Sequence, residues 1–257
     1  MGIFGNNKKT KRAAKAVKLL LKMADKGQRP FCSAVIVAAG SASRMEGVDK
    51  IFAKLHGITV LERAVAPFAA SKAVDEIVVV VREEALPHAE MLLRWKKSKK
   101  PVTIVKGGAT RWESVLNGLN ACSPKAKLAA VHDGARPLVT VDIVEEAIGK
   151  AASTGAAAPA VAVKDTIKVA EYGRVCYTPE RKSLFAVQTP QVFAMELLRA
   201  GILTAKEKQL PITDDCSAVE EIGVTVHLTE GDYENLKITT PEDLWLAESI
   251  LTRRAQP

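Results

Sequence analysis

The fold of this chain is indicated by one stretch, Ala34-Val35-Ile36-Val37-Ala38-Ala39-Gly40-Ser41-Ala42-Ser43-Arg44-Met45, with Lys50 five residues further on. Its apolar residues predict a buried strand, and the small residues after them predict a tight loop that leads to two cations. Such a loop presents backbone N–H groups and positive charge to a polyphosphate, which indicates a nucleotide-handling enzyme. The alternative is an ordinary turn of an α/β protein, because the stretch is neither a Walker loop nor a GxGxxG fingerprint.

Apolar runs alternate with amphipathic segments along the chain. The predicted strands are Ala34–Ala38, Ile77–Val81, Val102–Val105, Leu128–His132 and Ala156–Val163. The predicted helices lie near Val60–Ser71, Glu83–Lys97, Arg111–Ala121 and Val141–Ser153. This alternation is typical of an α/β fold with a mostly parallel, twisted sheet and helices on both faces. Ligands of such sheets bind beyond the carboxyl ends of the strands, so the turns at Gly40, Gly107-Gly108 and Asp133-Gly134 are expected to meet in one crevice.

Residues 164–188 interrupt this alternation. Thr166–Ala170 and Arg174–Thr178 predict two short strands around a turn, and the simplest interpretation is a β-hairpin arm that stands off the main sheet. Beyond the arm the sequence predicts helices near Ala194–Thr204 and Asp214–Ile222, a strand at Val224–Leu228 and a closing helix from Pro241.

The net charge of +8 is located in residues 1–30, which contain nine Lys or Arg residues and one acid, Asp25. The remaining 227 residues carry 28 bases and 28 acids. We therefore expect two parts, a basic amphipathic extension over residues 1–30 and a single domain over residues 31–257. The extension could contact anionic lipid, nucleic acid or an acidic partner, or remain a solvated helix, and its partner is unknown. A neutral domain gives no reason to expect nucleic-acid binding.

The cysteines and the apolar runs indicate a cytoplasmic protein. Cys32, Cys122, Cys176 and Cys216 lack metal-ligand spacing and are too few for a disulfide framework, so reduced thiols are expected. No run reaches eighteen apolar residues, and no membrane span is expected.

A carboxylate follows the fourth predicted strand, in Val131-His132-Asp133-Gly134-Ala135-Arg136-Pro137. A carboxylate at a strand end suits Mg²⁺, which takes one or two protein carboxylates and completes its shell with phosphate oxygens and water. The alternatives are a turn-forming role for Asp133 and a surface ion pair for Arg136. His132 is expected to be a packed residue rather than a base.

The third predicted strand is followed by Lys106-Gly107-Gly108-Ala109-Thr110-Arg111-Trp112-Glu113-Ser114. Two glycines let a flat base approach the backbone, and Ser114 adds a hydroxyl. The alternative is an ordinary turn in which Thr110 and Glu113 form a capping box, and both interpretations can hold together.

Taken together, these motifs resemble the 2-C-methyl-D-erythritol 4-phosphate cytidylyltransferase family. The resemblance rests on six segments that occur in that family's order and on a match from about residue 33 to 252. The segments are Ala38-Ala39-Gly40…Arg44-Met45…Lys50, Gly107-Gly108…Arg111…Ser114-Val115, Val131–Pro137, Gln188-Thr189-Pro190-Gln191-Val192-Phe193, Thr213-Asp214-Asp215 and Asn235-Leu236-Lys237-Ile238-Thr239.

The resemblance implies a Rossmann-like nucleotidyltransferase domain with Mg²⁺ as cofactor. The implied reaction transfers CMP from CTP to 2-C-methyl-D-erythritol 4-phosphate, a polyol phosphate, and gives CDP-methylerythritol and pyrophosphate. It also implies a homodimer in which each arm reaches the partner's site. The implied catalytic residues are Arg44, Lys50, Arg181 and Lys237. The implied nucleotide-binding residues are Ala38, Ala39, Gly40, Gly108, Ala109, Ser114, Asp133 and Gly134. The implied substrate-binding residues are Asp133, Arg136, Thr166, Arg181, Thr189, Thr213 and Lys237, and the implied metal ligand is Asp133.

The chain departs from the family pattern beside the lysine of the phosphate loop. The residue before Lys50 is Asp49, where the family usually has proline, and an acid at this position weakens the field of the lysine. Two alternative functions remain at this point. One is a ribitol 5-phosphate cytidylyltransferase, which shares the nucleotide site, and the other is a non-catalytic nucleotide-binding scaffold.

Overall fold

The computed structural model describes residues 18, 28–40, 49–94 and 99–256 of the 257-residue chain. Most of the predicted basic extension and the cation Arg44 therefore lie outside the described residues. Within the described part, no helix is long and apolar enough to cross a membrane.

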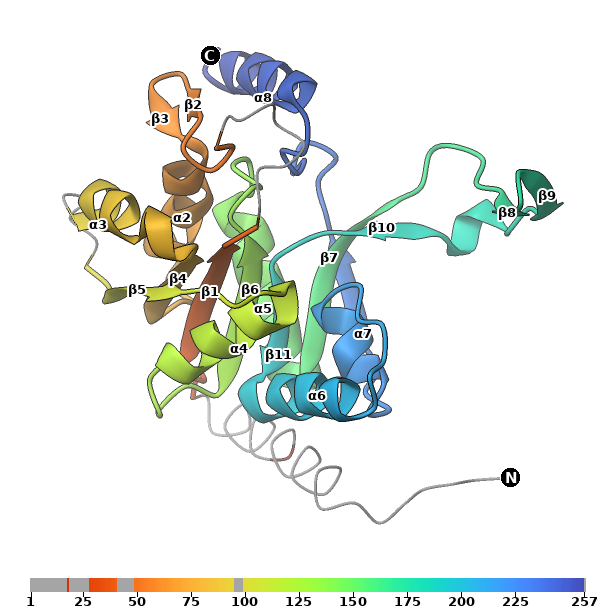
Figure 1. Cartoon of the computed structure of the whole chain (residues 1–257), viewed down its shortest axis with the longest axis horizontal. Helices are drawn as coiled ribbons and strands as arrows, with labels where there is room; N and C mark the ends of the chain where they lie inside the picture. Colours follow the sequence, from red (N-terminus) through yellow and green to blue (C-terminus); the bar gives the residue numbers. More distant parts are fainter. Residues whose placement is uncertain (1–17, 19–27, 41–48, 95–98, 257) are drawn as a thin grey trace.

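A mixed, mostly parallel sheet forms the centre of the molecule (Figure 1). Its strand order is β10-β7-β11-β6-β1-β4-β5, and β12 also pairs with β7. The parallel strands around the predicted crevice are β1 (Cys32–Ala38), β4 (Glu76–Val81), β5 (Val102–Lys106) and β6 (Leu128–Asp133). The other strands are β7 (Ala156–Ala162), β10 (Phe185–Val187), β11 (Gln191–Ala194) and β12 (His227–Glu230).

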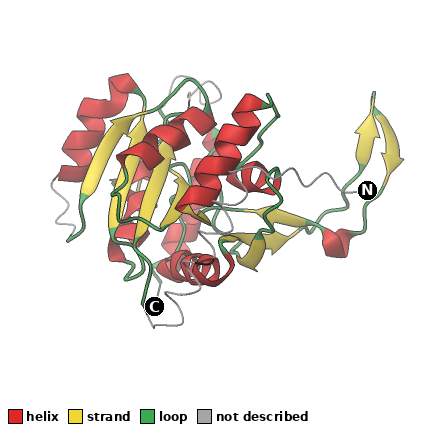
Figure 2. Cartoon of the chain, turned by 90° about the horizontal axis from the view of Figure 1, so that it is seen from below, coloured by secondary structure: helices red, strands yellow, loops and turns green. Residues whose placement is uncertain are grey.

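Helices cover both faces of this sheet, which confirms the predicted α/β class (Figures 1 and 2). One layer contains α2 (Val60–Ala70), α3 (Leu86–Arg94), which follows the short helix η1 (Glu83–Ala85), and α5 (Val141–Thr154). The other layer contains α4 (Arg111–Ala121), α6 (Met195–Glu207) and α7 (Asp215–Glu220). In β1, Ala34 and Ile36 pack toward the first layer and Val35 toward the second, as the period of two in a strand requires.

Each predicted strand and helix has a counterpart in the structure, although the strands predicted at Thr166–Ala170 and Val224–Leu228 lie at Val169–Glu171 and His227–Glu230. Gln191–Ala194 forms the antiparallel strand β11, which the sequence analysis missed because four residues are too few for a periodic signal. It also missed the small hairpin of β2 (Lys54–Leu55) and β3 (Ile58–Thr59). Together with α8 (Pro241–Arg254), this hairpin buries a third apolar cluster beyond the carboxyl edge of the sheet (Figure 1).

The predicted arm stands away from the body, with the paired strands β8 (Val169–Glu171) and β9 (Arg174–Tyr177) at its tip (Figures 1 and 2). Residues 185–187 form β10 and pair with β7, so the segment that leaves the main sheet ends before residue 185. The short helix η2 (Arg181–Ser183) leads back from the tip. At the root of the arm, the Tyr233 hydroxyl donates to the carbonyl of Ala162 over 2.7 Å.

Candidate active site

A pocket of about 280 Å³ opens where the carboxyl ends of four parallel strands meet. It lies where the turns after β1, β5 and β6 were expected to converge. Its lining includes the backbone of Ala38–Gly40 after β1 and that of Gly108 and Ala109 after β5. Its charged lining residues, among those described, are Lys50, Arg82, Arg111, Asp133 and Lys237. Four cations and one carboxylate make this pocket a site for a polyanion.

Two glycines allow the loops around the pocket to pack against each other. A Cβ atom on Gly107 would lie 2.4 Å from the Cβ of Ala39, and one on Gly134 would lie 2.7 Å from the Cβ of Ala38. The turns after β5 and β6 therefore fit directly against the loop after β1. The N–H groups of Gly107 and Gly134 donate to the carbonyls of Val81 at the end of β4 and Val37 near the end of β1, over 2.8 Å in each case.

The helix α4 begins at the pocket with the predicted capping box. Thr110 accepts from the Glu113 backbone, and the Glu113 carboxylate accepts from the Thr110 N–H. Ser114 is buried, and its hydroxyl donates to the Thr110 carbonyl over 3.0 Å and accepts from the Gly108 N–H over 3.1 Å. Ser114 therefore lies in the pocket wall and also fixes the glycine loop.

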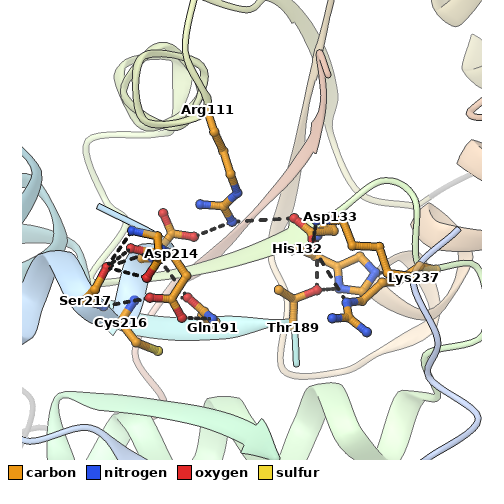
Figure 3. A network of polar contacts seen from close by, with 12 residues as sticks. Arg111, His132, Asp133, Thr189, Gln191, Asp214, Cys216, Ser217 and Lys237 are labelled. Atoms are coloured by element: carbon orange, nitrogen blue, oxygen red, sulfur yellow. Dashed lines mark hydrogen bonds and ion pairs between the residues drawn. The ribbon is translucent and has the colours of Figure 1, made fainter. Parts of the chain in front are cut away.

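Three cations surround the carboxylate of Asp133 (Figure 3). The distances to its oxygens are 2.8 Å from Lys237 Nζ, 3.5 Å from an Arg111 nitrogen and 3.7 Å from Arg136 Nε. Burial raises the pKa of this carboxyl, but the charges of Lys237, Arg111 and Arg136 outweigh burial and hold it well below its ordinary value. Asp133 is therefore a carboxylate at neutral pH.

A chain of hydrogen bonds below Asp133 fixes the end of β6 (Figure 3). The Asp133 N–H donates to the Thr189 hydroxyl over 3.1 Å, and Thr189 Oγ1 lies 2.9 Å from His132 Nδ1. His132 Nε2 lies 3.1 Å from the Arg136 carbonyl, which can only accept, so Nε2 donates and Nδ1 accepts from Thr189. Burial lowers the pKa of His132 to about 4, and the ring is neutral and packed, as expected.

Arg111 joins this pocket to the start of α7. Its guanidinium lies 2.7 Å from Asp215 and 3.5 Å from Asp133 (Figure 3). Gln191 holds the same helix start, because its amide oxygen accepts from the N–H groups of Asp215 and Cys216, over 3.0 and 3.1 Å. The predicted substrate residue Thr213 is exposed and lines a neighbouring hollow with Arg111 and Asp215.

The sequence-predicted residues fall into three groups in the structure. One group lines the pocket: Ala38, Ala39, Gly40, Lys50, Gly108, Ala109, Ser114, Asp133 and Lys237. A second group packs beside it: Gly134, Arg136 and Thr189. The third group lies away from it: Thr213 in the neighbouring hollow, and Thr166 and Arg181, which are exposed on the arm. Arg44 is outside the described residues.

Sequence analysis missed Arg82 and Arg111 as pocket residues. Both had a signal, since Arg82 directly follows the last apolar residue of β4 and Arg111 follows the double glycine after β5. The criterion that selected Asp133, a polar side chain at the carboxyl end of a parallel strand, applies equally to Arg82.

Asp133 is the one carboxylate among the described residues that line the pocket. No group of three potential ligands, His, Cys, Asp or Glu, is found within the described ranges. A single ionised carboxylate in a cationic pocket fits a Mg²⁺ ion that takes most of its ligands from substrate phosphates and water.

The chain resembles proteins of one family along nearly all of its length. The model of the family described as 2-C-methyl-D-erythritol 4-phosphate cytidylyltransferase matches residues 32–253. The protein of that name from Bacillus licheniformis is 43% identical over 218 residues, which cover 84% of this chain and 94% of the relative. The protein of the same name from Caldanaerobacter subterraneus is 45% identical over 224 residues, which cover 86% of this chain and 99% of the relative.

Solved structures show the same similarity. The crystal structure of 4-diphosphocytidyl-2C-methyl-D-erythritol synthase from Anaerococcus prevotii matches with a TM-score of 0.80 at 30% identity, covering 88% of this chain and all of that one. The 2-C-methyl-D-erythritol 4-phosphate cytidylyltransferase from Thermus thermophilus matches with a TM-score of 0.70 at 33% identity, covering 87% and 99%.

Proposed function

The chain belongs to the 2-C-methyl-D-erythritol 4-phosphate cytidylyltransferase family, and we propose that the pocket at the carboxyl edge of its sheet is where the reaction takes place. The enzyme transfers CMP from CTP to 2-C-methyl-D-erythritol 4-phosphate, an isoprenoid precursor, and gives CDP-methylerythritol and pyrophosphate. The observation that carries the site proposal is the lining of four cations and one carboxylate. Both substrates are phosphate anions, and this charge balance suits them.

The nucleotide is bound mainly by backbone groups of the pocket wall. Ala38, Ala39 and Gly40 lie on one side, and Gly108, Ala109 and Ser114 lie on the other. Backbone N–H and C=O groups in tight loops can read the edge of a base, and N–H groups can bind phosphate oxygens. Gly134 contributes by letting the loop after β6 fit against Ala38.

The chemical step requires position and charge more than proton transfer. The attacking phosphate oxygen of methylerythritol phosphate is already an anion at neutral pH, so no general base is needed. The phosphate oxygen forms a bond to the α-phosphorus of CTP, and the bond to the pyrophosphate oxygen breaks. Lys50 and Arg44 hold the extra negative charge of this transition state, as preorganised cations do in other phosphoryl transfers.

Asp133 is the residue that would hold Mg²⁺ on the CTP phosphates. The ion would neutralise the phosphate charge of CTP and of the departing pyrophosphate. Lys237 and Arg136 lie on the same carboxylate, at 2.8 and 3.7 Å. Asp133 thus orients these two cations, which bind the incoming phosphate, and Thr189 and Thr213 complete the alcohol-phosphate site.

Thr166 and Arg181 act in the pocket of a second subunit. Both are exposed on an arm that leaves the body, and the arm carries large exposed apolar side chains. These include Tyr172, Val175 and Tyr177, which are 60% exposed or more. Exposed apolar groups of this size are typical of a protein interface, which supports a homodimer with exchanged arms. We expect the enzyme to be cytoplasmic and the basic extension to remain outside catalysis.

The first test is pyrophosphate release with CTP and Mg²⁺, with methylerythritol 4-phosphate compared with ribitol 5-phosphate. Turnover with methylerythritol 4-phosphate alone is expected. The comparisons do not favour the ribitol phosphate enzyme or the non-catalytic scaffold. Turnover with ribitol 5-phosphate alone would contradict the substrate assignment, and CTP binding without turnover would contradict catalysis.

A further inference from the structure

The guanidinium of Arg82 joins the two loops that carry the phosphate-binding groups of the pocket. Arg82 directly follows β4, and each of its three nitrogens has a partner. One terminal nitrogen donates to the carbonyl of Gly40 over 2.8 Å, and the other lies 2.5 Å from the carboxylate of Asp49. The third, Nε, lies 2.7 Å from Glu84, which is 70% exposed and therefore weakly bound.

Asp49 begins the turn that carries Lys50. Its carbonyl accepts from the N–H groups of Phe52 and Ala53, over 2.9 and 3.1 Å. Its carboxylate is 3.4 Å from the N–H of Ile51. The position of Asp49 therefore sets the position of the turn, and Arg82 is the cation that holds Asp49.

Asp49 also places a negative charge next to the lysine that must attract phosphate. The side chains of Arg82 and Asp49 are only 22% and 27% exposed, so water screens their charges incompletely. Arg82 neutralises Asp49 at direct contact. Without Arg82, the Asp49 carboxylate would repel a triphosphate bound beside Lys50 and would attract Lys50 away from it.

We propose that Arg82 is a positioning residue of this enzyme: it neutralises Asp49, fixes the turn that carries Lys50 and ties this turn to Gly40. This inference rests on the proposed location of the CTP site in the pocket. It assigns a reason for the acid beside Lys50, since the Asp49 and Arg82 side chains form one unit. We assign the effect of Arg82 on CTP to Asp49 and the turn, because its guanidinium bonds to Gly40, Asp49 and Glu84 in this structure. Its terminal nitrogens keep further N–H groups, so direct contact with the phosphates is the competing outcome of the test.

A double-mutant cycle tests this inference. The four proteins are the wild type, Arg82→Met, Asp49→Asn and the double variant, and the readout is the Kd for CTP with Mg²⁺ and no alcohol phosphate. We expect Arg82→Met to raise this Kd about tenfold, within the range of coupled residues in contact. In the Asp49→Asn background, the same change is expected to raise the Kd about twofold or less, because no unpaired carboxylate remains.

Two outcomes would overturn the proposal. An equal loss in both backgrounds would mean that Arg82 itself contacts the triphosphate, and an unchanged Kd in Arg82→Met would mean that the ion pair does not serve binding. Arg82→Lys keeps the charge without the forked geometry and is expected to give an intermediate Kd. If the Kd of this variant equals that of the wild type, Arg82 acts only by neutralising the charge of Asp49, and the positioning role is wrong.

Arg29 provides a matched control. Its guanidinium lies 2.5 Å from Asp75 and donates to the Ala73 carbonyl over 2.8 Å, which repeats the Arg82 arrangement at the opposite, amino ends of β1 and β4. Arg29→Met is expected to leave the Kd for CTP unchanged, and thermal unfolding of every variant shows whether it is folded. Because the Kd for CTP is measured without an alcohol phosphate, the double-mutant cycle still tests the role of Arg82 if the assigned alcohol phosphate is incorrect.

Discussion

Asp133 lies at the end of a fully buried strand and is held by three cations, whereas Arg181 lies on the arm, where nearly every residue is exposed. The N–H of Asp133 and the groups below it form a continuous hydrogen-bonded chain through Thr189 and His132. On the arm, Arg181 donates to the carbonyl of Lys164 over 3.0 Å. The predicted site residues are thus held in two ways: Asp133 is held by the buried core, and Arg181 by a contact within the arm.

This contrast separates folding from chemistry. A residue held by the core contributes to the free energy of unfolding as well as to the reaction, because its removal leaves desolvated partners unpaired. In the proposed dimer, a residue on the exposed arm contributes to the reaction alone, in the pocket of the second subunit. Substitutions at the two places should therefore give different combinations of lost activity and lost stability.

Lys50→Ala should give the largest loss of activity in the pocket. In the proposed mechanism this cation stabilises the transition state, so we expect kcat to fall about 10²- to 10³-fold, or about 2.7–4 kcal/mol, as for a removed oxyanion donor. CTP binding should weaken less, and pyrophosphate release with separate CTP titrations measures both. The control is Lys54→Ala, an exposed lysine on β2. Unchanged turnover in Lys50→Ala would show that Lys50 is not at the reacting phosphate.

Asp133→Asn should lower both activity and stability, which is the mark of the core-held site. We expect kcat/KM to fall about a hundredfold, or about 2.7 kcal/mol. The free energy of unfolding should fall by about 2 kcal/mol, less than for a fully buried pair because Lys237 is 40% exposed. Urea unfolding and steady-state kinetics measure the two losses.

Mg²⁺ gives a sharper readout for the same variant. With Mg²⁺, CTP should bind more weakly to Asp133→Asn, because the proposed protein ligand of the metal is removed. Without Mg²⁺, CTP should bind more tightly, because the repelling carboxylate is gone and the cations remain. The same Mg²⁺ dependence in variant and wild type would contradict the metal role of Asp133.

The parts of the site that the sequence predicted are those with a local signal. A strand followed by small residues or by an aspartate gives a carboxyl-edge loop, so the positions of Gly40, Gly108 and Asp133 followed from β1, β5 and β6. The capping box of Thr110 and Glu113 was readable for the same reason. The family resemblance supplied the roles of Lys50 and Lys237, which no local pattern gives.

The parts that could not be predicted depend on contacts between distant segments. The hydroxyl of Thr189 bonds to the backbone of Asp133, 56 residues away, because the antiparallel strand β11 follows it beside β6. The contact of Arg82 with Asp49 spans 33 residues and depends on the pairing of β1 with β4. Such contacts are set by sheet order, which one sequence does not reveal.

His132 should make the free energy of unfolding depend on pH, although it takes no part in the reaction. Its pKa is about 4 in the folded chain, because burial lowers it from 6.5, so the unfolded chain binds an extra proton between these values. The stabilisation is complete above pH 6.5 and is lost as the pH falls toward 4, with about 2 kcal/mol lost at pH 5. Urea unfolding at pH 7 and pH 5 measures this loss.

His132→Gln isolates this contribution, because glutamine keeps a donor and an acceptor without titrating. We expect its free energy of unfolding to fall less between pH 7 and pH 5 than that of the wild type. His227→Gln, at an exposed position on β12, should change nothing. Equal falls in the wild type and in His132→Gln would mean that other groups cause the pH dependence.

Arg181→Ala should give the smallest loss of activity, and it should separate activity from stability most clearly. We expect KM for methylerythritol 4-phosphate to rise about tenfold, or about 1.4 kcal/mol, with KM for CTP unchanged. The free energy of unfolding should stay within about 0.5 kcal/mol, because Arg181 is exposed. Arg174→Ala, at an exposed position on β9, is the matched control on the same arm.

A mixed dimer decides which subunit receives Arg181. If the arm crosses, a dimer of one Arg181→Ala subunit and one Lys50→Ala subunit contains one intact site, with Lys50 from the first subunit and Arg181 from the second. Such a dimer, purified through two different tags, should have about half the wild-type activity at low methylerythritol phosphate. If Arg181 served its own pocket, neither site would be intact, and the mixed dimer would be no more active than the average of the two variants. That result would mean that Arg181, like Asp133, serves the pocket of its own subunit, and the contrast between the two regions would be lost.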